Sequence, residues 1–306
     1  MPADSLPLRG ISMIDFAYRF AAILVTAFLV QTCNAQQHVN VPRADGHTTP
    51  LLVYTAQGAH QGCAPIAVIS HGAGGSEDGY QYLARAMAQL GYTAIVMGHR
   101  ESGLQALRAD MRADGMLAGV RALVADPNAE TARLLDVGAA LAWADKQCHA
   151  PYRVLLGHSM GSETVMLEAG ARNMIGVLSP PADQDRFDAY VALSPEGPGV
   201  VFPDGAWHGI RKPILILTGT RDQSLKGGPN ARQIPWRNLP GSPRHCQWIG
   251  VIDGATHMNF AGSGLGHDAV EPQVTQTVAE FLSGTTHPTR SCAVPASTAS
   301  MALQAK

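Results

Sequence analysis

Residues 153–161 read Arg-Val-Leu-Leu-Gly-His-Ser-Met-Gly, and a helix-compatible segment follows them up to Gly170. A short apolar run that enters Gly-x-Ser-x-Gly predicts a sharp turn from a strand into a helix, which holds the serine hydroxyl above a sheet. Gly157 and Gly161 suit this turn, because only residues without side chains let the strand and the helix approach so closely. The pattern makes Ser159 a candidate nucleophile if the rest of the chain supplies a base, an acid and an oxyanion hole.

The composition of the chain fits one globular domain. It has 306 residues, of which 46% are hydrophobic and 15% are charged, and a chain of this kind can bury a full core. The formal net charge of -2 argues against nucleic acid or an anionic membrane surface as the main partner.

The N-terminus has the pattern of a secretory signal peptide. Arg19 precedes an apolar run at residues 20–30, which is too short to span a bilayer comfortably. Small residues at Cys33 and Ala35 suit a cleavage site after Ala35. We expect residues 1–35 to be a signal peptide and the mature protein to be periplasmic or extracellular, without a stable membrane span. An uncleaved membrane anchor and a lipoprotein attached through Cys33 are the alternatives.

Export changes the interpretation of the cysteines. Removal of residues 1–35 leaves Cys63, Cys148, Cys246 and Cys292, an even number in an oxidising compartment. The first two precede strands that we expect to be neighbours, and the last two flank the final strand and the helix that returns along it. We therefore expect disulfides Cys63–Cys148 and Cys246–Cys292, with four free thiols as the alternative.

Strands and helices alternate along the chain. Apolar runs predict buried strands at residues 65–70, 92–97, 153–156, 190–193, 213–217 and 247–252, and helical spacing recurs at residues 80–90, 130–147, 162–170 and 274–282. Edge strands are expected within residues 40–56, an extra helical excursion at 104–123, and a disordered tail at 293–306 after a folded domain at 36–292. The alternation predicts an α/β fold with a doubly wound, mostly parallel sheet and helices on both faces. Ligands bind such sheets at the carboxyl ends of the strands.

The candidate base lies in the loop after the last predicted strand. A serine nucleophile needs a histidine to take its proton, and in this class of sheet the histidine comes last in the chain. Four histidines follow the strand at residues 213–217: His245, His257, His267 and His287. We predict His257, because its loop can reach over Ser159, whereas His245 lies before the last strand, at the opposite end of the sheet.

Two acidic residues could orient that base. Asp222 ends a strongly apolar strand in a Gly-Thr-Arg-Asp turn, and Glu196 follows the preceding strand in Leu-Ser-Pro-Glu-Gly. We predict Asp222 as the acid and keep Glu196 as the alternative.

Backbone N–H groups are expected to form the oxyanion hole, because such a hole works by being preorganised. Met160 N–H lies at a helix N-terminus, and the loop His71-Gly-Ala-Gly-Gly75 would supply Ala73 N–H. A phosphate cradle is the alternative for a glycine-rich loop, but the Gly-Lys-[Ser/Thr] ending of a P-loop is missing. His71, His99 and His158 follow strand ends without the spacing of metal ligands, so we expect no metal and no cofactor.

Four separated motifs carry a family resemblance: His71-Gly-Ala-Gly-Gly, Met97-Gly-His-Arg-Glu, Gly157-His-Ser-Met-Gly and Gly254-Ala-Thr-His-Met-Asn-Phe. On these motifs the chain from Asn40 to Gly284 resembles the α/β-hydrolase superfamily, and within it the exported esterases that are similar to platelet-activating-factor acetylhydrolases and dienelactone hydrolases. True dienelactone hydrolases use a cysteine nucleophile, where this chain has Ser159. In the acetylhydrolase group the acid follows the earlier strand, where this chain has Ser194 and Glu196.

The resemblance implies an exported serine hydrolase that cleaves carboxylic esters through an acyl-enzyme. Its expected partner is a small-molecule or lipid-like ester, and the oligomeric state stays open. A peptidase or amidase on the same fold is one alternative, and a non-catalytic binding protein with a hydrolase fold is another.

Overall fold

The computed structural model describes residues 36–58, 61–178, 186–241, 246–286 and 292–306. The expected signal peptide at residues 1–35 lies outside these ranges. Within them, nine strands form one sheet in the order β1-β2-β4-β3-β5-β6-β7-β8-β9. The strands are β1 (Gln36–Pro42), β2 (Thr48–Tyr54), β3 (Ile66–Ser70), β4 (Thr93–Met97), β5 (Arg153–His158), β6 (Ala189–Leu193), β7 (Ile214–Gly219), β8 (Gln247–Ile252) and β9 (Met301–Ala305). The helices are α2 (Gln81–Gln89), α3 (Leu104–Asp114), α4 (Met116–Val124), α5 (Pro127–Gln147), α6 (Met160–Glu168), α7 (Ile234–Arg237) and α8 (His267–Thr286).

The centre of the sheet is parallel. Neighbouring strands from β4 through β3, β5, β6 and β7 to β8 run in the same direction, and β1, β2 and β9 pair antiparallel at the two edges. This arrangement confirms the predicted mostly parallel, doubly wound α/β sheet.

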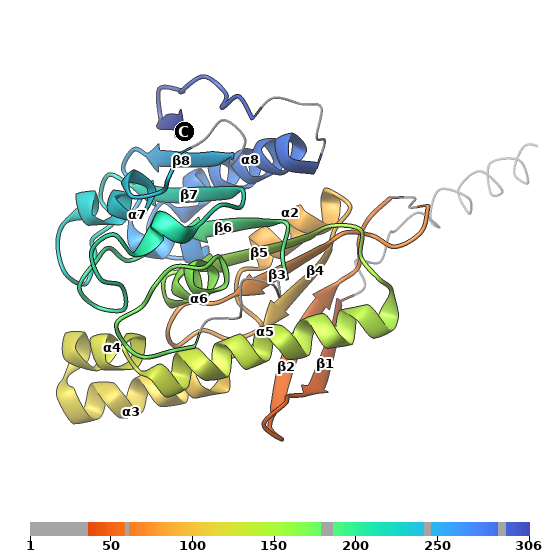
Figure 1. Cartoon of the computed structure of the whole chain (residues 1–306), viewed down its shortest axis with the longest axis horizontal. Helices are drawn as coiled ribbons and strands as arrows, with labels where there is room; N and C mark the ends of the chain where they lie inside the picture. Colours follow the sequence, from red (N-terminus) through yellow and green to blue (C-terminus); the bar gives the residue numbers. More distant parts are fainter. Residues whose placement is uncertain (1–35, 59–60, 179–185, 242–245, 287–291) are drawn as a thin grey trace, which may run out of the picture. The chain divides into compact units, whose positions relative to one another are not determined.

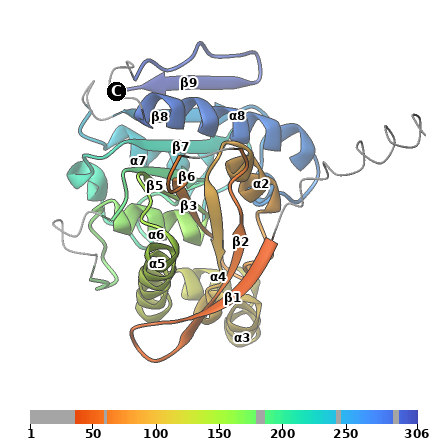
Figure 2. The same ribbon diagram turned by 90° about the vertical axis from the view of Figure 1, so that its right-hand side faces the viewer.

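Helices cover both faces of the sheet (Figures 1 and 2). Successive residues of a strand point to opposite faces, so Ile66 and Val68 of β3 pack into the core beneath α5 and α6. Ala67 and Ile69 pack into the second core, beneath α2 and α8. Because both faces are buried, the central strands are continuously apolar, which is the pattern of a parallel sheet.

The long helix α5 begins at a capping residue that is followed by a proline. Asp126 caps its N-terminus by accepting a hydrogen bond of 2.9 Å from Asn128 N–H, and Pro127 occupies the first turn. An oxygen side chain at the cap satisfies a backbone donor that has no partner inside the helix, and proline at this position needs none.

The register brings the ends of the parallel strands to one edge of the sheet. Ser70 at the end of β3 pairs with both Met97 of β4 and Gly157 of β5, and Leu193 at the end of β6 pairs with Leu217 of β7. The loops that follow these strands therefore emerge side by side, and they carry nearly all of the site described below.

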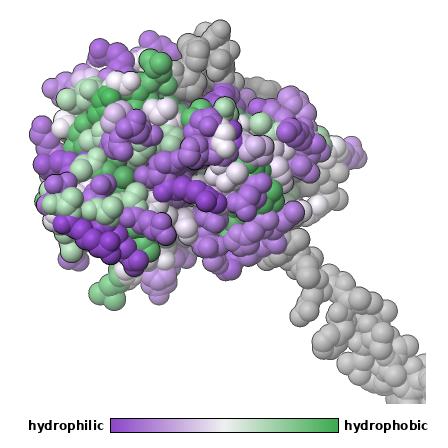
Figure 3. All heavy atoms as spheres, turned by 90° about the horizontal axis from the view of Figure 1, so that it is seen from below, coloured by the Kyte–Doolittle hydropathy of each residue, from purple (hydrophilic) through white to green (hydrophobic). Residues whose placement is uncertain are grey.

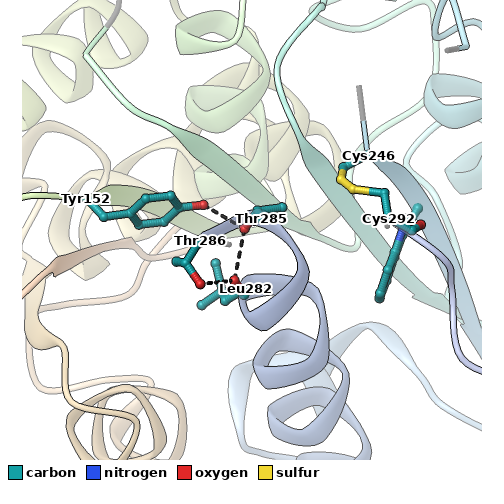
Figure 4. Close-up of a disulfide and its surroundings, with 7 residues drawn as sticks. Tyr152, Cys246, Leu282, Thr285, Thr286 and Cys292 are labelled. Carbon is teal, nitrogen blue, oxygen red and sulfur yellow. Dashed lines mark hydrogen bonds between the residues drawn. A yellow bond between two sulfur atoms is a disulfide. The ribbon is translucent and has the colours of Figure 1, made fainter. Parts of the chain in front are cut away.

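The cysteines are paired as the sequence predicts. Cys63 and Cys148 lie before β3 and β5 with their Cα atoms 5.6 Å apart, and the Cα atoms of Cys246 and Cys292 are 5.3 Å apart. Figure 4 shows the second disulfide near the end of α8, where Thr285 and Tyr152 share a hydroxyl hydrogen bond of 2.7 Å. Both disulfides lie where the strands begin, away from the loops at their carboxyl ends.

The end of the chain corrects one prediction. In place of a disordered tail at residues 293–306, Met301–Ala305 form β9, which pairs with residues 248–252 of β8, and the compact unit runs from Gln36 to Lys306. Met301 and Leu303 are buried, and they pack over Gly250 of β8, which leaves them room. The strand also covers an edge whose backbone groups need partners, so the alternating apolar residues of the tail have a structural cause.

The predicted helical excursion consists of α3 and α4, joined at Gly115. Leu104, Met116 and Leu117 of this pair are 47%, 73% and 62% exposed, and Figure 3 shows apolar side chains gathered among hydrophilic ones on the face seen from below. Within the described ranges, no helix has both the length and the apolar character needed to cross a membrane.

Candidate active site

Ser159 occupies a strained turn between β5 and α6. Its φ of 54° and ψ of -123° lie outside the regions that non-glycine residues favour. A Cβ on Gly157 would collide with the carbonyl oxygen of Gly161, and a Cβ on Gly161 would collide with that of Ser70. Ser159 N–H donates a 3.0 Å hydrogen bond to Leu193 O at the end of β6. The two glycines therefore allow the tight approach that aims Ser159 at the loops around it.

His257 lies directly beside Ser159. Its Nε2 atom is 2.9 Å from Ser159 Oγ, and its Nδ1 atom is 3.1 Å from Asp222 Oδ1. The His257 side chain is 29% exposed, whereas that of Asp222 is fully buried. The residue begins the short helix η5 (His257–Ala261), whose capping box at Thr256 and Asn259 fixes the loop. The structure thus brings together a serine, a histidine and an aspartate, which are far apart in the sequence.

Asp222 is held in its ionised form. Burial raises the pKa of this carboxyl, but the hydrogen bond with His257 and the positive charge of Arg232 outweigh burial and lower the pKa to about 2. Thr218 Oγ1 donates a further hydrogen bond of 2.8 Å to Asp222 Oδ2. The carboxylate is therefore charged and fixed in orientation at any pH near neutrality.

Glu196, the alternative acid, bonds to groups other than His257. Its carboxylate accepts hydrogen bonds from Ser224 Oγ at 2.6 Å and from Leu225 N–H at 3.1 Å, and it pairs with Arg232 NH1 at 3.1 Å. Of the two candidate acids, the structure places Asp222 against His257.

The glycine loop after β3 passes beside the serine. A Cβ on Gly72 would lie 3.2 Å from Ser159 Cβ, and the loop is held by Gly74 N–H, which bonds to Ser102 O at 2.8 Å. In the described part of the chain, neither Ala73 N–H nor Met160 N–H has a hydrogen-bond partner. Two unpaired backbone donors, one of them at the N-terminus of α6, are therefore left to bind an oxygen beside Ser159.

His158 connects this loop to the loop of His257. Tyr80 OH accepts a hydrogen bond of 3.0 Å from Gly72 N–H and lies 2.7 Å from His158 Nδ1. His158 Nε2 lies 3.0 Å from His257 O, which can only accept, so the ring proton is on Nε2 and Nδ1 accepts from Tyr80. Burial, and then the neighbouring His257, keep the pKa of His158 well below its usual value. A neutral histidine thus fixes the spacing between the two loops.

The other histidines at strand ends also have structural partners. His71 Nδ1 bonds to Gly72 O at 2.6 Å, and His71 Nε2 accepts from His99 N–H at 3.0 Å. The ring of His99 lies between Ser70 Oγ at 2.9 Å and Asp136 Oδ2 at 2.8 Å. Burial is the main cause that lowers the pKa of both rings. With each ring nitrogen already bonded, these residues offer no position to a metal, and the described residues contain no cluster of three metal-ligating side chains.

Comparison with known structures identifies the fold. No family model matches the chain, and neither does any curated protein. A solved structure described as a dienelactone hydrolase from Klebsiella pneumoniae superposes with a TM-score of 0.59 at 18% identity, covering 81% of this chain and 98% of that one. The chain has the α/β-hydrolase fold.

Two further α/β-hydrolase structures are similar. Est1E from Butyrivibrio proteoclasticus gives a TM-score of 0.52 at 16% identity, over 80% of this chain and 99% of that one. The esterase Pf2001 from Pyrococcus furiosus gives 0.53 at 15% identity, over 81% and 92%. Identities this low establish the fold, and the chemistry has to be argued from the residues of this chain.

The remaining candidate histidines do not reach Ser159. His267 Nδ1 pairs with Glu271 Oε1 at 2.6 Å on α8. His245 and His287 lie outside the described residues. Of the histidines with described positions, His257 is the one that faces Ser159 in this α/β-hydrolase fold.

Two residues of the site were given no role by the sequence-based prediction. Ser194 lies at the end of β6 with Oγ 2.7 Å from His257 Nδ1. Arg232, in the short helix η4 (Pro229–Gln233), reaches Asp222 Oδ1 at 3.2 Å. The position of Ser194 directly after a strand is a signal that could have been used. Arg232 follows no pattern, because it lies in an irregular segment.

A cavity adjoins the site without containing it. Gly74 and Gly75, next to Ala73, line a space of about 860 Å³ together with residues of β1, β2 and the start of α3. Ser159 and His257 are not among the described residues that line this cavity.

Proposed function

We propose that this protein is an exported serine hydrolase that cleaves carboxylic esters through an acyl-enzyme. The observation that carries the proposal is the continuous contact from Ser159 Oγ to His257 Nε2 at 2.9 Å and from His257 Nδ1 to Asp222 Oδ1 at 3.1 Å. A nucleophile, a base and an orienting carboxylate in this order form the constellation used for acyl transfer.

In the first half of the reaction, Ser159 Oγ attacks the acyl carbon of the ester while its proton passes to His257 Nε2. The carbonyl oxygen becomes negative, and Ala73 N–H and Met160 N–H stabilise it. When the carbon–oxygen bond of the ester breaks, the leaving alcohol takes the proton from His257 Nε2, and the acyl group stays on Ser159.

In the second half, water replaces the alcohol. His257 Nε2 takes a proton from the water as its oxygen attacks the acyl carbon, and the same oxyanion donors act again. Collapse returns the proton from His257 to Ser159 Oγ and releases the carboxylic acid. Asp222 keeps its negative charge throughout, because the pKa of about 2 leaves it ionised, and it stabilises the transient imidazolium.

The proposed esterase activity is supported by the solved structures of similar fold as well as by the site. The solved structures of similar fold include two described as esterases or dienelactone hydrolases besides Est1E. The preferred substrate is a small-molecule or lipid-like ester. A peptidase or amidase is tested by assaying peptide substrates beside esters.

Export is proposed on two grounds. The sequence has a signal-peptide pattern at residues 1–35, and two disulfides staple the domain, which suits an oxidising compartment.

The proposal is tested by p-nitrophenyl-ester hydrolysis in Ser159→Ala. We expect loss of at least about 10⁴-fold in kcat, with an unchanged circular dichroism spectrum, because alanine removes the nucleophile and only one oxygen atom. Ser162→Ala is the control, since Ser162 lies in the first turn of α6 with its hydroxyl bonded to Ser159 O. Turnover by Ser159→Ala at the rate of the wild type would show that the mechanism is wrong.

A further inference from the structure

Ser194 lies closer to the base than the acid does. Its Oγ atom is 2.7 Å from His257 Nδ1, whereas Asp222 Oδ1 is 3.1 Å from the same nitrogen. The Ser194 side chain is completely buried, so water does not compete for it. The hydroxyl is nearer to the base than the carboxylate is, so we expect it to have its own effect on the position of the base.

The backbone of Ser194 is held in a conformation that serine does not favour. Its φ of 55° makes it one of four non-glycine residues with positive φ in the described part of the chain, and glycine is the usual residue at such positions. Ser194 N–H donates to Leu217 O at 2.7 Å, and Ser194 O accepts from Arg232 NH1 at 3.0 Å. The fold thus fixes the position of the side chain from both neighbouring peptide groups.

The positions of the protons follow from the neighbours. In the proposed function, His257 Nε2 accepts the proton of Ser159, so the proton of the neutral ring is on Nδ1. Ser194 Oγ at 2.7 Å and Asp222 Oδ1 at 3.1 Å both face this nitrogen, so both oxygens can accept from Nδ1–H. Arg232 NH2 also lies 3.2 Å from Nδ1, but it cannot take the proton of Nδ1, because a guanidinium has no acceptor, and it donates to Gln223 O at 2.6 Å.

We propose that Ser194 is a positioning residue, and that His257 Nδ1–H forms a bridge to two acceptors at once, Ser194 Oγ at 2.7 Å and Asp222 Oδ1 at 3.1 Å. The inference rests on the proposed function for its effect on turnover. No covalent bond is exchanged in the bridge: Nδ1 keeps its proton and Asp222 keeps its charge during the whole cycle. The hydroxyl sets the angle of the imidazole ring, and through the ring it sets the position of Nε2 against Ser159.

The test compares Ser194→Gly with Ser194→Ala. Both variants lose the hydroxyl, but glycine relaxes the positive φ and alanine does not, so the glycine variant unfolds at a higher temperature than the alanine variant. If the hydroxyl positions His257, both variants lose about tenfold in kcat at nearly constant KM, as for the loss of one buried hydrogen bond. If Ser194 matters only for stability, the glycine variant keeps the turnover of the wild type, and that result overturns the proposal.

A second readout does not depend on turnover. The Nδ1–H proton of His257 is followed by NMR in the ¹⁵N-labelled wild type and in Ser194→Gly. We expect the resonance to move downfield in the variant, because the proton is then no longer shared with Ser194 and bonds to the carboxylate alone, and hydrogen bonds to charged acceptors are shorter and stronger. An unchanged resonance overturns the bridge. Failure of the esterase proposal would instead show as undiminished turnover by Ser159→Ala, so the two failures are distinguishable.

Discussion

Asp222 and Glu130 are both buried carboxyl groups close to the serine turn, and they are in opposite states. Asp222 follows β7 and has its pKa lowered to about 2. Glu130 lies on α5, against the helix that follows Ser159, and burial raises its pKa to about 7 despite the nearby charge of Arg133. The two residues have the same functional group and the same lack of solvent, so burial does not explain the difference.

The partners of each carboxyl group explain it. Asp222 is surrounded by His257, Arg232 and the hydroxyl of Thr218. Glu130 has one long hydrogen bond of 3.3 Å from Thr164, and its Oε1 atom has no hydrogen-bond partner in the described part of the chain. Donors and a positive charge compensate the loss of water in the first case and largely fail to do so in the second. A buried acid can orient a base only if such partners keep it charged.

The largest expected effect separates the two carboxyl groups by turnover. Asp222→Asn removes the charge that stabilises the imidazolium and should lower kcat by about 10⁴-fold, measured with a p-nitrophenyl ester. Glu130→Gln should leave kcat within about twofold of the wild type, because Glu130 does not touch His257. Glu196→Gln is the second control, and a larger loss there than in Asp222→Asn would assign the acid to Glu196.

Arg232→Gln tests what keeps Asp222 charged. The charge of Arg232 lowers the pKa of Asp222, so its removal raises that pKa, loosens the carboxylate and should lower kcat about 100-fold. Arg232→Lys keeps the charge without the fork of donors, and we expect it to lose less. Equal activity of Arg232→Gln and the wild type would show that the guanidinium is dispensable.

The stability of the protein at acidic pH also depends on Asp222 and Arg232. The pKa of Asp222 is lowered from 3.8 to about 2, so its ionised form stabilises the fold above about pH 4, by about 2 kcal/mol, and this contribution is lost as the pH falls toward 2. In Arg232→Gln the loss should be smaller, because the folded-state pKa is nearer to the unfolded one. Urea unfolding at a series of pH values between 2 and 5 measures the difference.

A second effect of pH on stability has the opposite sign, belongs to Glu130 and should leave turnover unchanged. Its pKa is raised from 4.5 to about 7, so the folded protein holds a proton that the unfolded chain has released. The free energy of unfolding should therefore fall by up to about 3 kcal/mol as the pH rises from 4.5 to 7. Glu130→Gln should flatten this fall without changing kcat. The pKa of neighbouring Glu163 is also raised, by burial and then by Glu130, so part of the pH dependence remains. A variant with the same slope as the wild type would exclude this role for Glu130.

The sequence was sufficient to predict those parts of the molecule whose structure follows from a local pattern. Apolar runs bounded by glycine predicted the parallel strands, and chemistry-bearing residues directly after those runs included Ser159, Asp222 and His257, which the structure brings together. The two cysteine pairs followed from the expected strand order. For the strands and the three site residues, one strand and its next loop contain the information; for the cysteines, the expected order of neighbouring strands was enough.

The rest depends on contacts that no local pattern encodes. β9 was missed because Met301 and Leu303 become apolar positions of a strand only when the edge of β8 is beside them. Arg232 comes from an irregular segment, and its role is visible only once it lies between Asp222 and Glu196. The choice between these two acids likewise required the three-dimensional structure, since both follow strand ends.

The central claim is that Ser159 is an activated nucleophile, and its most direct measurement is labelling by a fluorophosphonate followed by mass spectrometry of the intact and digested protein. The account predicts one adduct per chain, on the peptide that contains Ser159, with no adduct in Ser159→Ala and much slower labelling in His257→Ala. Absence of labelling in the folded wild-type protein, or an adduct that persists in Ser159→Ala, would contradict it.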